Sequence, residues 1–295
     1  MILEKRIPLK YWFKEIKWDL LIVSVFSVII YFIKLYLIDL DIPLSIGAFL
    51  GTAIALLLSF KLSQSYDRWW EARKIWGAIV NDSRTLVIQL KQFCKESDNS
   101  IVKTMAYRQI AWCYTLGRHL RKQDVLGNLE DFISEDEIIF IKQKNHVPLT
   151  LLDHHGQNVR SLHRENLLNN FQQIQLDSTI LKFTASMGMA ERIKNTVFPR
   201  TYRNVLHFFI YIFLLLLSLA LENIYGFLEI PLLVLISIPF FMLEKIAFVI
   251  QDPFENKPTD TAMTSIARNI EINIKELLGE KEFPEPLKNS GFYIM

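Results

Sequence analysis

The sequence predicts an all-α membrane protein that combines four transmembrane helices per subunit with a helical body in water. Half of its 295 residues are hydrophobic (51%), and the mean hydropathy is +0.21. At the same time 22% of the residues are charged, which is too many for a chain that lies wholly in lipid. No alternating run bounded by turn residues is long enough to predict a sheet. We therefore expect uncharged helices in the membrane and amphipathic helices outside it.

The first two spans form a hairpin. Residues 42–60 contain no charged side chain over 19 positions. As a helix this run reaches about 28 Å, enough to cross the hydrocarbon core. Residues 18–38 are apolar except for Asp19 and Lys34. Both charges stand close enough to an end of the run for us to expect them to reach the interface by snorkelling. Only three residues separate the two spans, so the turn between them is short.

A second pair of spans lies near the other end of the chain. Residues 205–221 are apolar apart from His207, and residues 230–250 are interrupted only by Glu244 and Lys245. Both runs have the length of a membrane-spanning helix. A membrane enzyme would need a cluster of titratable groups at one depth, and Glu244 with His207 is too small a basis for one. We predict no enzymatic activity.

The distribution of basic residues predicts the orientation. Lys and Arg are concentrated at the N-terminus and directly after the second span, whereas both short hairpin turns carry acids and no Lys or Arg. Cytoplasmic loops are enriched in Lys and Arg. Both termini, the middle segment 61–204 and the C-terminal segment 251–295 should therefore face the cytoplasm, with the protein crossing the cell inner (plasma) membrane several times.

The middle segment, residues 61–204, reads as a cytoplasmic helical body. It carries most of the charge, and stretches such as RTLVIQLKQF and ILKFTASMGMAERI place apolar residues at i, i+3 and i+4. This spacing is typical of amphipathic helices. We see no repeat at a fixed period, so we treat residues 1–295 as a single domain.

The common signals of catalysis, cofactor binding and nucleic-acid binding are absent from the sequence. No GxxxxGK[ST], GxGxxG, GxSxG or HExxH motif occurs, and the net charge of +2 gives no field directed at nucleic acid. His154, His155 and His163 lack a supporting ligand spacing, because adjacent histidines do not share a helix face. We interpret them as solvated loop histidines. Cys94 and Cys113 read as reduced structural thiols. We predict no cofactor and no metal.

The most informative stretch is GTAIALLLSFKLSQSYDRWWEARKIWGAIVNDSR, residues 51–84, in which an uncharged helix runs into a segment rich in Arg, Trp and Asp. One interpretation is an interfacial belt, with Trp69, Trp70 and Trp76 at the level of the lipid headgroups and Arg68 and Arg73 snorkelling. However, nothing breaks the helix between residues 60 and 66. A single helix that continues from the membrane into the cytoplasmic body would suit the wall of a pore.

Three segments carry a resemblance to a known family. SYDRWWEARKIWG with NDSR, followed far downstream by QDPFENKPTDTAM and ARNIEINI, resembles the prokaryotic branch of the bestrophins, and the resemblance covers nearly the whole chain. It implies a homopentamer that assembles around a central pore. The second span of each subunit would line a narrow hydrophobic neck, and a second constriction would lie at the cytosolic end.

The resemblance also assigns pore residues. The neck positions of the family fall at every fourth residue before the RWW block, which gives Thr52, Leu56 and Phe60 here. Their spacing places them on one helix face. Thr52 departs from the family, in which an apolar side chain is usual, so the outer neck should be less completely dewetted. The cytosolic constriction corresponds to Phe171.

The ion is assigned by the family as well. The resemblance implies a channel for small monovalent ions, with chloride as the default. The family also has members that pass cations, and Asp39 and Asp41 around an outer mouth would attract a monovalent cation such as sodium. Eukaryotic members bind calcium through an acidic run, whereas here Phe254 is followed by Glu255, Asn256 and Lys257, which do not provide an oxygen cage.

Two other classes of membrane protein compete with the channel interpretation. A secondary transporter should show inverted repeats and discontinuous helices, and no internal repeat relates the two hairpins. A non-conducting membrane scaffold would fit the same hydropathy, and the absence of ion flux would favour it. In the channel interpretation a single pore-type helix per chain cannot enclose an aqueous path, so several copies must surround it.

Overall fold

The computed structural model describes residues 9–36, 42–95, 99–196, 200–288 and 293–294. The chain packs as two compact units. We call residues 4–69 with 197–252 the apolar unit, and residues 70–196 with 253–295 the polar unit. Every regular element of the described residues is a helix, which confirms the all-α fold class.

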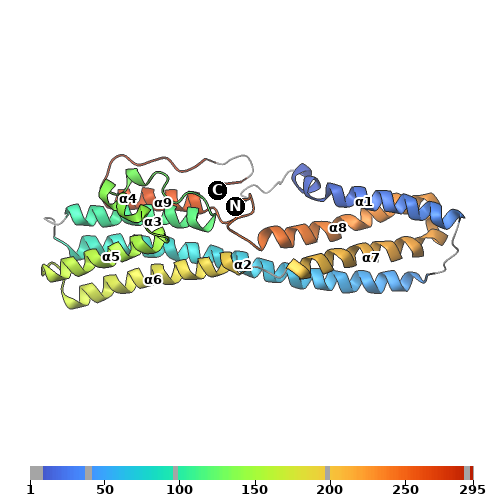
Figure 1. The fold of residues 1–295 in the computed structure, drawn as a ribbon, viewed down its shortest axis with the longest axis horizontal. Coiled ribbons are helices and arrows are strands. Elements are labelled where there is room, and N and C mark those ends of the chain that lie inside the picture. Colours follow the sequence, from blue (N-terminus) through green and yellow to red (C-terminus); the bar gives the residue numbers. More distant parts are fainter. Residues whose placement is uncertain (1–8, 37–41, 96–98, 197–199, 289–292, 295) are drawn as a thin grey trace. The chain divides into compact units, whose positions relative to one another are not determined.

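The apolar unit contains the four helices that are long and apolar enough to cross a membrane. They are α1 (Leu9–Tyr36), the first part of α2 (Leu44–Phe93), α7 (Arg200–Tyr225) and α8 (Glu229–Ile250), with the short η3 (Gly226–Leu228) between the last two. In Figure 1, α8 runs alongside both α1 and α7. The predicted spans fall on these helices, except that residues 42 and 43 of the second precede α2 and residues 37 and 38 of the first lie outside the described part.

The surface of the apolar unit is itself largely apolar. Only 22–44% of the residues in the four candidate spans are buried inside the chain. Large side chains such as Trp18, Phe32 and Leu235 are exposed. A soluble protein rarely leaves so much contiguous apolar surface in water. Lipid or neighbouring subunits are the environments that suit such a surface.

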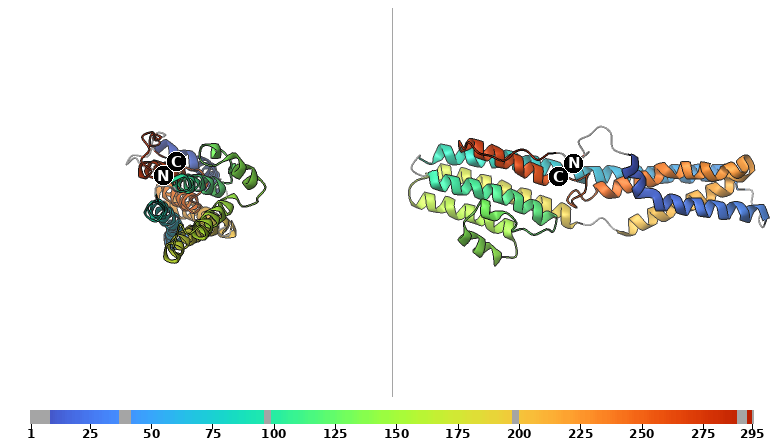
Figure 2. Two further views of the ribbon diagram at one scale, coloured as in Figure 1. Left: turned by 90° about the vertical axis from the view of Figure 1, so that its left-hand side faces the viewer. Right: turned by 90° about the horizontal axis from the view of Figure 1, so that it is seen from above.

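The polar unit is a helical bundle built around the second part of α2. Its further helices are α3 (Asn99–Leu120), α4 (Glu135–Lys142), α5 (Val147–Arg164), α6 (Asn170–Asn195) and α9 (Met263–Leu277), with the short η2 (Leu129–Asp131). Figure 2 shows α3 lying beside α9, and α5 lying beside α6. The helix start signals are local: the Ser134 side chain caps α4, and Asn169 with Gln172 forms a capping box at α6.

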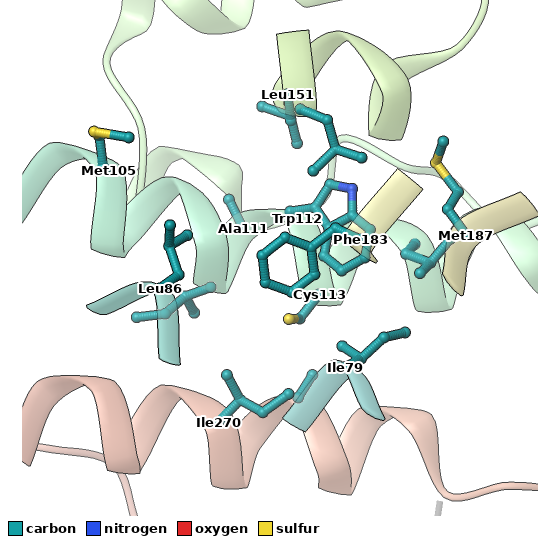
Figure 3. Packing of buried hydrophobic residues seen from close by; sticks show 14 of the residues in the cluster. Ile79, Leu86, Met105, Ala111, Trp112, Cys113, Leu151, Phe183, Met187 and Ile270 are labelled. Atoms are coloured by element: carbon teal, nitrogen blue, oxygen red, sulfur yellow. The ribbon is translucent and has the colours of Figure 1, made fainter. Parts of the chain in front are cut away.

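The core of the polar unit draws on α2, α3, α5, α6 and α9 (Figure 3). Trp112 and Phe183 lie at its centre with ring centroids 5.2 Å apart. Trp76 is fully buried in the same core. The interfacial-belt interpretation is therefore wrong for Trp76, because the second part of α2 is amphipathic and its apolar face packs against α3 and α9. The uninterrupted helix through residues 60–66 is confirmed, since α2 runs without a break from Leu44 to Phe93.

Candidate functional site

Within the apolar unit, α2 has one packed face and one uncovered face. Ile54 and Leu58 are buried, and Leu58 is only 1% exposed. On the opposite side Leu56 and Phe60 are 57% and 60% exposed, and Thr52 is exposed as well. Their i, i+4, i+8 spacing aligns them along the helix. We call Thr52, Leu56 and Phe60 the uncovered stripe. Packing within the chain does not occupy it, and its role as a pore neck stays a prediction.

The hydroxyl of Thr52 is partly used by its own helix. Its Oγ1 donates a hydrogen bond to the carbonyl oxygen of Ala48 over 2.8 Å. Because the hydroxyl proton is committed, the group can only accept further hydrogen bonds. At this end of the stripe the side chain therefore presents a methyl group and an acceptor oxygen, which is more polar than the hydrocarbon side chains of Leu56 and Phe60.

Two glycines hold the other side of α2 close to α7. A Cβ atom on Gly51 would lie 3.0 Å from Cε2 of Phe213, and one on Gly47 would lie 3.3 Å from Cδ1 of Leu217. Larger residues would push the helices apart or displace these side chains. The glycines thus fix which side of α2 faces the chain, and so which side remains uncovered.

Beyond Phe60, two basic side chains connect α2 to the end of α8. Lys61 is buried, and its Nζ donates to Oε1 of Gln251 over 2.6 Å. The Nε of Arg68 donates to the backbone oxygen of Gln251 over 2.9 Å. Asp67, next to Arg68, is exposed on the side of the helix that continues the uncovered stripe. The stripe therefore leads from apolar side chains to a carboxylate.

A polar cluster joins α1, α7 and α8 inside the apolar unit. Asp19 is buried and lies 3.4 Å from Nζ of Lys245 and 3.6 Å from Nε2 of His207. The other ring nitrogen of His207 lies 2.9 Å from Oε2 of Glu244, and the Tyr211 hydroxyl donates to Asp19 over 3.2 Å. Asp19 is thus satisfied by partners from two other helices inside the unit, while its depth relative to the membrane interface stays a prediction.

Lys34 is also paired inside the unit instead of snorkelling. Its Nζ lies 3.2 Å from Oε2 of Glu229, and the two side chains are 2% and 0% exposed. Nζ also donates to the backbone oxygen of Ser218, and the Ser218 hydroxyl donates to Glu229. Buried charges persist in proteins when they are paired and hydrogen-bonded in this way. The sequence singled out Lys34 but not its partner Glu229.

The other predicted pore residues are placed differently. Phe171 lies in the first turn of α6 and is 83% exposed, so the described chain leaves its ring largely uncovered. Its role as a cytosolic constriction stays a prediction. Asp39 and Asp41, the predicted outer-mouth charges, lie outside the described residues.

The histidines considered in the sequence do not form a cluster. All three lie on α5 (Val147–Arg164), so the interpretation as loop residues is wrong. His155 is fully buried, and burial lowers its pKa to about 3. The Nδ1 of His154 lies 2.7 Å from Glu137, and the Nδ1 of His163 faces the backbone oxygen of Leu168.

A different trio in the polar unit has the donor set of a metal site. His119, His146 and Glu191 come from α3, the residue before α5, and α6, and their ligand atoms lie within 4.8 Å of one another. His146 Nε2 is 2.8 Å and His119 Nε2 is 3.4 Å from the same Glu191 oxygen. However, His146 Nδ1 accepts the backbone N–H of Leu149, so the ring proton stands on Nε2 and faces Glu191. A metal ion would have to displace that proton. No local sequence signal marks this trio.

The segment after α8 is held by its own side chains. Lys257 pairs with Glu255, and the backbone N–H of Lys257 donates to Oδ2 of Asp260 over 3.0 Å. Asn256, between the paired residues, has a positive φ of 67°. The carboxylate that directly follows Phe254 is thus paired with a lysine, which does not suit a calcium cage.

Relatives of known name match most of the chain. It is 29% identical over 276 residues to the voltage-dependent anion channel-forming protein YneE of Escherichia coli strain K12, covering 93% of this chain and 90% of that protein. It is 28% identical over 248 residues to a voltage-dependent anion channel-forming protein from a Nostoc strain, covering 82% of this chain and 81% of that one.

Solved structures and the family pattern agree with these relatives. The crystal structure of a bacterial bestrophin homologue from Klebsiella pneumoniae matches with a TM-score of 0.84 and 26% identity, covering 90% of this chain and all of that chain. The sequence pattern of the family described as Bacterial/Fungal Bestrophin protein matches residues 12–276.

Proposed function

Because the chain belongs to the bacterial and fungal bestrophin family, we propose that it is the pore-forming subunit of an anion channel in the inner membrane, with chloride as the permeating ion. The names of the relatives from Escherichia coli and Nostoc support an anion channel. The four apolar helices support its placement in a membrane. Both termini and the polar unit then lie in the cytoplasm, as the positions of the basic residues predict.

The observation that carries this proposal is the uncovered stripe on α2. Thr52, Leu56 and Phe60 face away from the packed core of their own unit. One such helix cannot enclose a path for ions, so the proposal requires a ring of subunits. Following the family resemblance, we take this ring to be a homopentamer. Five copies of Leu56 and Phe60 would form an apolar constriction that conducts when wetted and blocks when dry.

A monovalent cation channel of the same fold is the second candidate, and one observation favours it. Asp67 lies seven residues beyond Phe60, two helical turns along the same face of α2, and its side chain is exposed. Repeated around an axis, this carboxylate would attract cations and repel anions at the cytoplasmic end of the neck. In an anion channel Asp67 would have to face away from the ion path.

Reversal potentials in planar bilayers decide between the two ions. Purified protein is reconstituted with a potassium chloride gradient across the bilayer. A reversal potential close to the chloride equilibrium value supports the anion channel, and one close to the potassium value overturns it in favour of the cation channel. Asp67→Asn should leave an anion channel unchanged or raise its current, whereas it should weaken cation selectivity. Absence of current from the reconstituted protein would contradict both proposals.

The assembly is tested independently of the ion. The detergent-purified complex should have the mass of about five 34.6 kDa chains. A monomer or dimer under conditions that preserve channel activity would overturn the pentamer. For the orientation, a cysteine introduced at residue 40 should react with an impermeant reagent only from the side opposite the cytoplasm, and labelling from the cytoplasmic side would contradict the proposed topology.

A further inference from the structure

A cavity of about 360 Å³ in the polar unit brings three arginines together. It lies at the end of α3, beneath the chain that follows this helix, and against the start of α9. Arg118, Arg121 and Arg268 line it, and its other lining residues include the amides Gln123 and Asn128. No Asp or Glu is among the described residues that line it. None of these residues belongs to the uncovered stripe or to the other predicted pore residues.

Arg118 is fixed in place but has no partner for its charge. Its guanidinium lies on Gly127, where a Cβ atom would come within 3.0 Å of Nη1. That nitrogen is buried and has no hydrogen-bond acceptor among the described residues. Within the same described part of the chain, no carboxylate lies within 4.0 Å of Arg118 to form an ion pair. Gly127 therefore provides room for a guanidinium that has no ion-pair partner among the described residues.

Arg121, one helical turn further on, is only partly satisfied. Its Nη1 donates to the hydroxyl of Thr264 over 2.6 Å. Its Nε and Nη2 are buried and have no acceptor in the described structure. Burial lowers the pKa of Arg121, and the nearby Asp260 opposes this effect. Asp260 acts at a distance, because no ion pair joins the two side chains within the described residues.

Arg268 completes the group from α9. Its Nε donates to the Tyr114 hydroxyl over 3.0 Å and lies 3.5 Å from Oε2 of Glu271. Glu271 also accepts from Tyr114 over 2.7 Å and pairs with Lys275 at 3.0 Å. This single carboxylate thus serves two cations and a hydroxyl. It does not balance the other two arginines.

These contacts leave a net positive cavity with buried N–H groups that lack acceptors. Water can accept from N–H groups but does not remove the repulsion between guanidinium ions. Buried polar groups and charges without partners are costly, and in folded proteins such groups usually mark a bound ion, a ligand or water. Guanidinium groups bind oxyanions through short, charge-assisted hydrogen bonds, often two at a time.

We propose that this cavity binds an oxyanion of the phosphate class, either inorganic phosphate or the phosphate group of a small cytoplasmic molecule. A tetrahedral anion offers acceptor oxygens in several directions, which suits arginines that stand on α3, directly after it and on α9. The volume exceeds what a monatomic anion would fill. A second cavity of about 620 Å³ shares Tyr114, Arg118, Asn128 and Arg268 with the first, but Asp131, Glu271, Glu280 and Glu282 also line it. The phosphate group therefore belongs in the first cavity, and only an uncharged or cationic remainder of a larger ligand would suit the second.

The test is a titration of the full-length detergent-purified protein with inorganic phosphate in a phosphate-free buffer, followed by calorimetry and by thermal melting. We expect saturable binding of one phosphate per subunit, a raised melting temperature, and competition by sulfate. Arg118→Gln and Arg121→Gln should each weaken binding by about tenfold or more, because each removes charge-assisted hydrogen bonds. Arg84→Gln is the matched control: this exposed arginine donates to Asn273 over 3.0 and 2.6 Å, away from the cavity, and its loss should not change phosphate affinity.

Gly127→Ala provides a test that keeps all three charges. Its methyl group should displace the Arg118 guanidinium and weaken phosphate binding, and Gly127→Ser should do the same. Wild-type protein that binds no phosphate at millimolar concentration overturns the proposal, whatever the variants do. The proposal is also overturned if folded Arg118→Gln and Arg121→Gln proteins bind phosphate with the same affinity as the wild type. If the arginine variants lose the oligomer and the wild type binds no phosphate, the occupant is a carboxylate of a second copy, and the proposal is wrong.

Discussion

Two leucines on α2 offer a matched test of the uncovered stripe. Leu56 and Leu58 are the same residue type, two positions apart on one helix, and they face opposite sides. Leu58 is packed in the core of the apolar unit, so Leu58→Ala should leave a cavity and lower the free energy of unfolding by about 2–5 kcal/mol. Leu56 is mostly exposed within the chain. Leu56→Ala should therefore change the stability of the unit by only about 0.5 kcal/mol, as is usual for an uncovered position.

The expected effects on conduction are reversed. Leu56→Ala should widen an apolar ring, lower the barrier to wetting and raise the single-channel conductance, and Phe60→Ala should act in the same direction. Thr52→Ile should make the outer end of the stripe drier and lower the conductance. Residue 58 faces away from the ion path, so Leu58→Ala channels that still assemble should conduct like the wild type.

Single-channel recording and thermal melting of the complex, applied to the same preparations, measure both quantities. The interpretation holds if the two leucine variants separate, one changing conductance and the other changing stability. It is refuted if Leu56→Ala destabilises the complex as much as Leu58→Ala does while its conductance stays at the wild-type value. The stripe would then be a surface that packs against another helix.

Two further predictions concern buried charge. Lys34→Met leaves Glu229 buried without its cation and should lower the free energy of unfolding by about 3–5 kcal/mol, whereas the double variant Lys34→Met, Glu229→Gln should recover most of this loss. Thermal melting of the detergent-purified protein measures both variants. A Lys34→Met variant as stable as the wild type would contradict the prediction. Burial lowers the pKa of His155 to about 3 from 6.5, so the unfolded chain binds more protons between these values. The contribution of His155 to the free energy of unfolding should be complete above pH 6.5 and fall by up to about 1.4 kcal/mol per pH unit below it. His155→Leu should flatten that slope in acid-unfolding curves. An unchanged slope would show that His155 is not the group responsible.

The helices could be predicted from the sequence because their signals are local. An uncharged run of sufficient length predicts an apolar helix, and the lack of any break between residues 60 and 66 indicated that α2 is continuous. Asn169 and Gln172 mark the start of α6 in the same local way. The spacing of Thr52, Leu56 and Phe60 also predicts that they share a face.

The pairing of polar groups could not be predicted, because the partners are far apart in the chain. Lys34 and Glu229 are 195 positions apart, and nothing near either residue names the other. When the partner is unknown, a charged residue near the end of an apolar run is interpreted as a snorkelling side chain. Trp76 was misassigned for a similar reason, since composition alone does not distinguish a tryptophan at an interface from one in a core that distant helices complete.

The arginine cavity shows the same limit. Arg118 and Arg121 stand close together in sequence, and Arg268 is more than a hundred positions away. The fit of the Arg118 guanidinium over Gly127 depends on the path of the chain after α3. A sequence-based search for phosphate sites relies on glycine-rich motifs, and this cavity uses none.

Cysteine accessibility tests the central claim, that α2 lines the ion path, most directly. Leu56→Cys and Leu58→Cys are introduced in a Cys94→Ser background. Cys113 can remain because it is fully buried and burial raises its pKa to about 12, so it should react slowly with thiol reagents. A charged methanethiosulfonate reagent added during bilayer recording should change the current of Leu56→Cys channels and leave Leu58→Cys channels unaffected. Leu56→Cys channels whose labelling is confirmed by mass but whose current is unchanged would contradict the account.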